Sequence, residues 1–253
     1  MSTLAILNFN GRAYLNKCLE SVPHIPGLKK ILIDNASKDE SYQIADEYGF
    51  SVVHADNKHQ FITGINKAIE VAGPGTFIFS QADVVFHHMA IQELIWASED
   101  NKDAFIQPVF IRPGFGIDNA GMRWVWPGYG IGTLKKRSGI YLTDIVTSIT
   151  FATQKSNLDK IGYYDTNFAP AYYEDCDMAL RAKKRGIKQL VCGGSFVTHR
   201  HNESFKKMYS KLAISDICRK NRKYLINKHY GGINRWTRWI VVNILDFFVA
   251  SFQ

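Results

Sequence analysis

Short apolar runs alternate with helically spaced apolar residues through the first eighty positions of the chain. Helical spacing appears at residues 14–19 and 62–72, and Gly73, Pro74 and Gly75 end the second of these stretches. Four apolar runs of strand length surround them, at residues 4–7, 30–33, 51–54 and 76–79. Alternation of this kind predicts βαβ units with right-handed crossovers, and therefore a mainly parallel α/β sheet flanked by helices.

A further helix is predicted between the second and third strands. Ser37 and Glu40 have the spacing of a capping box, in which each side chain bonds the other residue's backbone N–H. We therefore expect a helix that opens there and runs to about Tyr48.

The second half of the chain is less regular. Residues 114–132 are rich in glycine and aromatic residues, including Trp124, Trp126 and Tyr129, and this loop either contacts a sugar or fills a surface groove. Gly186 is expected to end a helix that starts near residue 174. Further strands are predicted at residues 105–111, 145–152, 188–191 and 196–198.

Polar residues follow three of the first four predicted strands. In a parallel sheet, ligands bind outside the carboxyl ends of the strands. Any one such residue is more often a turn former or a helix cap. Because three strands end in this way, a binding crevice is the favoured interpretation, lined by Asn8, Asn10, Asp34, Asn35 and Asp83.

Three carboxylates crowd into four positions at the start of the helix predicted near residue 174. Anions are favoured at a helix N-terminus, where backbone N–H groups are unpaired, and Glu174 and Asp175 there are candidates for a general base. The structural alternative is an acidic cap, with Asp177 and Arg181 forming an i,i+4 ion pair.

Missing motifs narrow the chemistry of the crevice. The chain has neither the glycine-rich dinucleotide fingerprint nor a P-loop, which disfavours a dehydrogenase or a P-loop ATPase. Asp83 instead offers a hard oxygen ligand for Mg²⁺ or Mn²⁺. His199 follows the last predicted strand, and it is either a second metal ligand or a hydrogen-bonded surface residue.

Composition indicates a globular protein with a basic appendage. The 253 residues carry a net charge of +8. Residues 205–238 hold ten Lys or Arg and one acid, a net +9, so the remainder is close to neutral. The four cysteines form no C-x-x-C pair, and the first residues lack the features of a signal peptide, so we expect a reducing, cytoplasmic location.

Seven segments of the chain, in this order, match the motifs of a known family: residues 8–10, 33–39, 64–66, 82–83, 161–165, 173–181 and His199. Together they resemble family 2 glycosyltransferases, with greatest similarity to a bacterial rhamnosyltransferase-like branch, and the resemblance runs from residue 4 to about 230. It implies a GT-A fold, inversion at the sugar, a divalent metal and a nucleoside-diphosphate donor such as dTDP-rhamnose or a UDP-sugar.

The resemblance also implies roles for individual residues. Asp175 would be the general base, with Glu174 orienting the acceptor hydroxyl, and Asp83 and His199 would hold the metal. Donor and nucleotide contacts would come from Asn8, Asn10, Asp34, Asn35, Asn66 and Asp83.

One departure from the family pattern leaves two functions open. The family often carries a second acidic residue or an Asn-Pro-Asp sequence at the end of the fourth strand, but this chain has Gln81, Ala82 and Asp83. A single carboxylate there weakens metal binding, so a non-catalytic sugar-nucleotide-binding scaffold is the alternative. A nucleotidyltransferase is disfavoured because the chain lacks its glycine-rich N-terminal loop.

The last fifty residues differ from the rest. We expect a GT-A domain over residues 1–204, with a nucleotide half at about 1–100 and an acceptor half at 101–204, and a basic amphipathic tail over 205–253. The tail's aromatic residues are Trp236, Trp239, Phe247, Phe248 and Phe252.

Two surfaces compete for this tail. The apolar run at residues 239–245 is too short to span a bilayer, which requires about 20 residues. The tail either packs on the catalytic domain or docks on an anionic membrane surface, where it would meet a saccharide or polyprenyl-linked saccharide acceptor. No nucleic-acid-binding module is recognisable. The expected location is therefore peripheral, at the inner face of the cell membrane.

Overall fold

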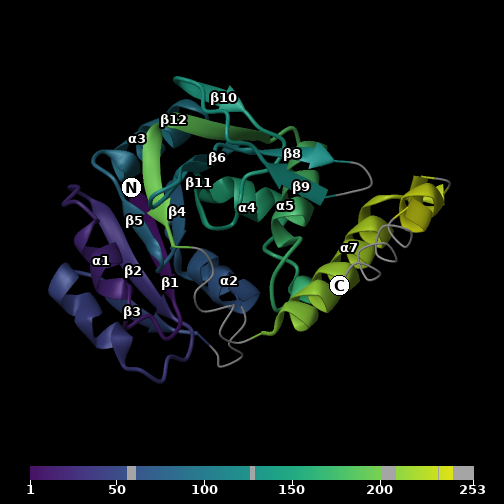
Figure 1. The fold of residues 1–253 in the computed structure, drawn as a ribbon. Helices are drawn as coiled ribbons and strands as arrows, with labels where there is room; N and C mark the ends of the chain where they lie inside the picture. The colour runs from purple at the N-terminus through teal and green to yellow at the C-terminus, as the bar shows by residue number, and fades with distance from the viewer. Residues whose placement is uncertain (56–60, 126–128, 201–208, 233, 242–253) are drawn as a thin grey trace.

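The structure, a computed structural model, describes residues 1–55, 61–125, 129–200, 209–232 and 234–241 (Figure 1). One large sheet runs through the molecule in the strand order β10-β12-β6-β11-β4-β1-β2-β3. The elements in chain order are β1 (Ser2–Asn8), α1 (Leu15–Glu20), β2 (Leu28–Asp34), the 3-10 helix η1 (Ser41–Tyr48), β3 (Ser51–His54), α2 (Phe61–Val71), β4 (Thr76–Gln81), β5 (Val84–Phe86), α3 (Ala90–Asp100), β6 (Ala104–Arg112), β7 (Gly116–Asn119), β8 (Met122–Val125), β9 (Tyr129–Gly132), β10 (Ile140–Leu142), β11 (Thr150–Gln154), α4 (Lys155–Ile161), η2 (Thr166–Phe168), α5 (Glu174–Lys184), β12 (Lys188–His199) and α7 (Lys211–His229).

The N-terminal half of the sheet is parallel, as predicted. Strand β1 pairs in parallel with β2 and β4, and β2 pairs in parallel with β3. In this register Asn8 lies beside Asp34, and Leu7 lies beside Gln81. The polar residues that follow these strands therefore emerge along one edge of the sheet.

The other half of the sheet is mixed. Strand β11 is antiparallel to both β4 and β6, while β6 is parallel to β12. Strands β6 and β12 therefore point the same way as β1. This direction brings His199, the last residue of β12, to the same sheet edge as Asn8 and Asp34.

Two hydrophobic clusters cover the two faces of the sheet. Alternate residues of β1 face opposite sides, so Leu4 and Ile6 join one cluster while Ala5 and Leu7 join the other. Helices α1 and α3 pack on the first face, and α2, α4 and α5 on the second. The result is a three-layer α/β/α arrangement, so the predicted fold class is confirmed.

The predicted capping box is wrong. Ser37 does not cap a helix, because its hydroxyl accepts hydrogen bonds from the Asn10 backbone N–H and the Asn8 side chain at 3.0 and 3.1 Å. Glu40 has a left-handed backbone with φ of 56° and makes no cap. The segment that follows is the 3-10 helix η1 rather than an α-helix.

Three other boundaries differ from the predictions. The predicted loop at residues 114–132 contains the short strands β7, β8 and β9. The strand expected from residue 145 begins only at Thr150. The two strands expected near the C-terminal end of the domain are one strand, β12, with an irregularity between Cys192 and Phe196. That bulge supplies the break that the apolar pattern had placed between two strands.

Helix α7 packs against the body of the molecule. Its Leu225 is fully buried in the same cluster as residues of α2 and α5. In Figure 1, α7 lies beside α5 and continues outward into the segment 234–241. Within the described part of the chain, no helix combines the length and apolar character needed to cross a bilayer.

Candidate active site

Asn8 is the centre of a polar cluster at the ends of β1 and β2. Its side chain is fully buried, and Nδ2 donates to Asp34 Oδ1 at 3.2 Å, Ser37 Oγ at 3.1 Å and Ser41 Oγ at 2.9 Å. Gly11 follows at close range, since a Cβ there would lie 2.1 Å from Asn8 Oδ1. These hydrogen bonds and this close packing therefore hold the loops that follow β1 and β2 in one arrangement.

The neighbouring predicted residues tie the two loops together. Asn10 Oδ1 accepts a 2.8 Å hydrogen bond from the Lys38 backbone N–H. The backbone N–H of Asn35 donates to the carbonyl of Asn8 at 2.8 Å, and the Asn35 side chain is buried. His54 Nδ1 approaches Asp34 Oδ2 at 3.4 Å. Four of the predicted donor-side residues therefore share one edge of the sheet.

Asp83 and His199 come together as the sequence predicted. His199 Nε2 lies 3.4 Å from Asp83 Oδ2, and both side chains are buried. Asp83 Oδ1 has no hydrogen-bond partner among the residues described. These residues fit Mg²⁺ or Mn²⁺, which accept one or two protein ligands and fill their other positions with phosphate oxygens and water.

The described residues contain no larger group of metal ligands. Within ranges 1–55, 61–125, 129–200, 209–232 and 234–241, no cluster of three or more His, Cys, Asp or Glu side chains is arranged to hold a metal. Asp83 and His199 are thus a two-ligand set that needs oxygen atoms from a bound diphosphate or water to complete it.

Glu174 and Asp175 begin helix α5, as predicted. Glu174 is buried, and its Oε2 has no hydrogen-bond partner in the described chain. Burial, followed by repulsion from the Asp175 carboxylate, raises the pKa of Glu174 to about 8. Burial also raises the pKa of Asp175, although its Oδ1 accepts a 2.7 Å hydrogen bond from the Cys176 N–H. Each of the two neighbouring carboxyls therefore binds a proton more tightly than a solvated acid does.

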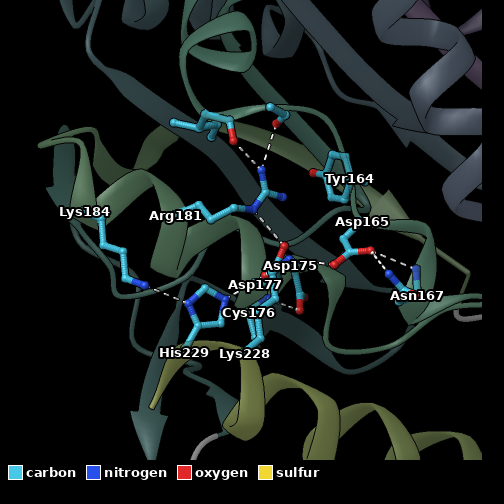
Figure 2. A network of polar contacts seen from close by, with 12 residues as sticks. Tyr164, Asp165, Asn167, Asp175, Cys176, Asp177, Arg181, Lys184, Lys228 and His229 are labelled. Carbon is cyan, nitrogen blue, oxygen red and sulfur yellow. Dashed lines mark hydrogen bonds and ion pairs between the residues drawn. The ribbon is translucent and has the colours of Figure 1, made fainter. Parts of the chain in front are cut away.

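Asp177 has a structural role, as predicted. Its fully buried carboxylate accepts a 2.8 Å hydrogen bond from Arg181 Nε and contacts Lys228 Nζ at 2.8 Å and His229 Nε2 at 2.7 Å (Figure 2). Arg181 also donates to the carbonyls of Ile161 and Gly162. Helix α5 is thereby fixed on one side to the end of α4 and on the other to α7.

Asn66 makes a structural contact. Its amide forms two hydrogen bonds with the backbone of Tyr164, with Nδ2 donating to the carbonyl at 2.8 Å and Oδ1 accepting from the N–H at 2.9 Å. The buried Tyr164 hydroxyl lies 3.2 Å from Ser148 Oγ. This contact joins α2 to the segment between α4 and η2. A donor contact by Asn66 stays a prediction.

The sequence interpretation missed how the C-terminal helix holds the site. The Tyr224 hydroxyl donates to Asp165 Oδ2 at 2.9 Å. Lys228 Nζ donates to the same oxygen at 2.7 Å, and His229 bonds Asp177 (Figure 2). A signal was present in the chain, because the contacting residues recur at helical spacing. They are Asn221, Tyr224, Leu225, Lys228 and His229.

Two aromatic predictions have mixed outcomes. Trp124 of β8 is half-buried against the core, so the predicted sugar contact stays a prediction, and Trp126 lies outside the described residues. In the tail, Trp236 and Trp239 are exposed at 63% and 42%. The three predicted tail phenylalanines, at positions 247, 248 and 252, also lie outside the described residues.

Comparison with solved structures defines the class of fold. The chain is similar to GalNAc-T7, solved with UDP, GalNAc and Mn²⁺, at a TM-score of 0.67 and 17% identity over 87% of this chain and 48% of that one. It is also similar to S. aureus TarS 1–349 in complex with UDP-GlcNAc, at a TM-score of 0.65 and 14% identity over 91% of this chain and 68% of that one. These similarities establish a GT-A fold. The chain spans about half of the first protein and about two thirds of the second.

The family follows from the sequence itself. The family model described as glycosyl transferase family 2 matches residues 3–162, more than half of the chain. The chain therefore belongs to glycosyl transferase family 2, and the predicted family is confirmed. The comparison with curated proteins found no match. The rhamnosyltransferase-like branch stays a prediction.

Proposed function

We propose that this protein is an inverting glycosyltransferase that moves a hexose from a nucleoside-diphosphate donor to a glycan or a polyprenyl-linked saccharide. Asp175 and Glu174 carry the proposal, because they place two adjacent carboxylates with raised pKa values at the N-terminus of α5, and Glu174 is buried. Acidic caps that serve only to stabilise a helix are normally solvated. This pair instead has the raised proton affinity of a general base site.

The two carboxylates have different roles in the proposed reaction. Glu174, with its pKa raised to about 8, keeps a proton at neutral pH, and Asp175 accepts the proton of the acceptor hydroxyl. The raised pKa of Asp175 brings it closer to working pH, which strengthens it as a base. Glu174, as a neutral donor, orients the hydroxyl that attacks the sugar from the face opposite the leaving group.

The donor binds along the edge formed by β1, β2 and β4. Asn8, Asp34 and Asn35 would contact the nucleotide, and Asp83 and His199 would hold a divalent cation. Such a cation, when bound, neutralises charge that develops on the leaving diphosphate. The donor is dTDP-rhamnose or a UDP-sugar. The UDP and UDP-GlcNAc bound to the two similar structures support a uridine nucleotide.

Release of nucleoside diphosphate from a panel of nucleotide sugars tests the function. With Mn²⁺ and an acceptor mixture, the wild-type protein should release one nucleoside diphosphate, and Asp175→Asn should lose at least about 100-fold of that rate. Asp159→Asn, an exposed acid on α4, is the matched control. Equal rates for Asp175→Asn and wild type would contradict the assignment of the base.

A sugar-nucleotide-binding scaffold is the second candidate, favoured by the single carboxylate at the end of β4. It predicts that a nucleotide sugar raises the melting temperature but is never consumed. Turnover separates the two functions, because a scaffold should bind the nucleotide sugar yet release no nucleoside diphosphate with any acceptor.

We also propose that the segment beyond α7 contacts an anionic membrane surface at the inner face of the cell membrane. Trp236 and Trp239 are exposed beside cationic residues, and Lys223 Nζ lies 5.6 Å from the Trp239 ring centre. Interfacial helices combine such aromatic and basic groups. Binding to vesicles that contain phosphatidylglycerol should fall with salt. Equal binding to neutral phosphatidylcholine vesicles would count against the electrostatic part.

A further inference from the structure

The turn that leads into the proposed base is conformationally strained. Tyr172 and Tyr173 both have left-handed backbones, with φ of 74° and 70°, directly before Glu174 and Asp175. Residues with a Cβ rarely adopt this region, and two in succession persist only where the surroundings hold them. Tyr173 is also the N-cap residue of α5, and its own side chain makes no capping hydrogen bond. Some other part of the chain must therefore stabilise the turn.

Asn221 of α7 supplies that support. It is fully buried, and its Nδ2 lies within hydrogen-bond distance of three carbonyls of the turn, those of Phe168, Ala171 and Tyr172, at 2.7, 2.9 and 3.0 Å. Asparagine is a poor helix former, so a helix gains nothing locally from this residue. The contribution of Asn221 is that one side-chain amide contacts three backbone carbonyls of the turn.

Other residues on the same face of α7 contact the chain on both sides of the turn. Ahead of it, the Tyr224 ring meets the Phe168 ring edge-on at 4.9 Å, and Tyr224 and Lys228 both bond Asp165. Beyond it, Lys228 and His229 hold Asp177 (Figure 2). The two proposed catalytic carboxylates lie between these anchor points.

We propose that Asn221 is a positioning residue of the catalytic centre. Its amide holds the strained turn, and the turn sets where the Glu174 and Asp175 carboxylates stand relative to the acceptor hydroxyl. Asn221 itself does not touch a substrate. This inference rests on the proposed transferase function and deepens it, because it makes α7 a part of the catalytic unit as well as the base of the tail.

The test compares Asn221→Ala and Asn221→Asp with Asn227→Ala, an exposed asparagine on the same helix. Asn221→Asp keeps the shape but turns carboxylate oxygens toward three carbonyl oxygens, which repel them. We measure kcat and the donor KM with the full-length protein, and hydrogen exchange of the backbone at residues 168–177 and 28–55. Circular dichroism identifies the variants that are folded.

Positioning predicts a specific split between these measurements. In both Asn221 variants kcat should fall by at least about tenfold, because small displacements of a catalytic group are costly, while the donor KM stays within about twofold. Exchange should rise at 168–177 and stay unchanged at 28–55. Asn227→Ala should match the wild type in all of these measurements.

Two results would overturn the inference. One is a folded Asn221→Ala variant whose kcat equals that of Asn227→Ala. The other is unchanged exchange at residues 168–177, which would show that the turn does not depend on Asn221. The exchange measurement also separates failure of the proposed transferase function from failure of the inference about Asn221. If no donor is turned over by the wild type, the transferase function fails, yet exchange still decides whether Asn221 holds the turn.

Discussion

Removing the Asp177 carboxylate should destabilise the protein far more than removing an exposed acid with the same helical spacing. Asp177 is fully buried and contacts three side chains at 2.7 to 2.8 Å, the cationic Arg181 and Lys228 and the imidazole of His229. Asp177→Ala leaves these groups without their shared acceptor. Asp159, in an i,i+4 pair with Lys155 on α4, has a side chain that is 55% exposed and is the control.

The expected loss of stability in Asp177→Ala depends on which other partners Arg181 and Lys228 retain. Breaking a buried ion pair costs about 3–5 kcal/mol. Lys228 retains Asp165 and Arg181 retains two backbone carbonyls, so the lower end, about 3 kcal/mol, is expected. In a chain of this length that corresponds to a melting temperature lower by about 6–12 °C. Asp159→Ala should cost no more than about 0.5 kcal/mol.

The pH dependence of the unfolding free energy provides a second check on the contribution of the Asp177 carboxylate. Burial alone would raise the pKa of Asp177, but the hydrogen bond from His229 and the charges of Arg181 and Lys228 hold it below its ordinary value. The stabilisation is therefore complete above the unfolded pKa of about 3.9 and is lost as the pH falls below it. Urea unfolding of the wild type and Asp177→Asn should differ at pH 7 and converge in acid. Equal costs for the Asp177 and Asp159 variants would refute the reasoning.

Three other predictions concern separate parts of the molecule. Glu174→Gln should gain stability relative to the wild type as the pH rises from about 4, the ordinary pKa of Glu in an unfolded chain, to about 8, because ionising the buried Glu174 opposes folding. Urea unfolding at several pH values measures this, and a difference in unfolding free energy that does not change with pH would contradict it. Gly193→Ala should cost about 1–3 kcal/mol, because its Cβ would lie 2.1 Å from the carbonyl oxygen of Arg137, whereas Gly194→Ala would meet only the Glu93 side chain at 3.3 Å and should cost less in the same unfolding assay. Mn²⁺ should raise the melting temperature of the wild type with UDP present but not that of Asp83→Asn, and an equal rise in both would remove Asp83 from the metal site.

Much of the donor side could be predicted from the sequence because its signals are local. Each of the first four strands is a short apolar run, and the residue types that follow a strand do not depend on distant contacts. Parallel pairing then places Asn8 and Asp34 side by side. The pairing of Asp83 with His199 was also predictable, since both follow strands that end at the same edge of the sheet.

Local signals failed where a distant group competed for the same atom. Ser37 and Glu40 have the spacing of a capping box, yet the Ser37 hydroxyl is taken by Asn8 and Asn10, which are nearly thirty positions earlier in the chain. A hydroxyl oxygen that accepts two such bonds is not available to start a helix. No window of sequence around residue 37 contains that information.

The family, the alternation of strands and helices and the residue types available for chemistry can all be read from the sequence. The different environments of the three acids of α5 arise only in the folded chain. Asp177 is bonded by His229 and lies beside the charges of Arg181 and Lys228, which lower its pKa, while burial and the Asp175 carboxylate raise the pKa of Glu174 to about 8. Adjacent acids in a chain are alike until packing surrounds each with different charges, because burial and neighbouring charge set the pKa of a carboxylate.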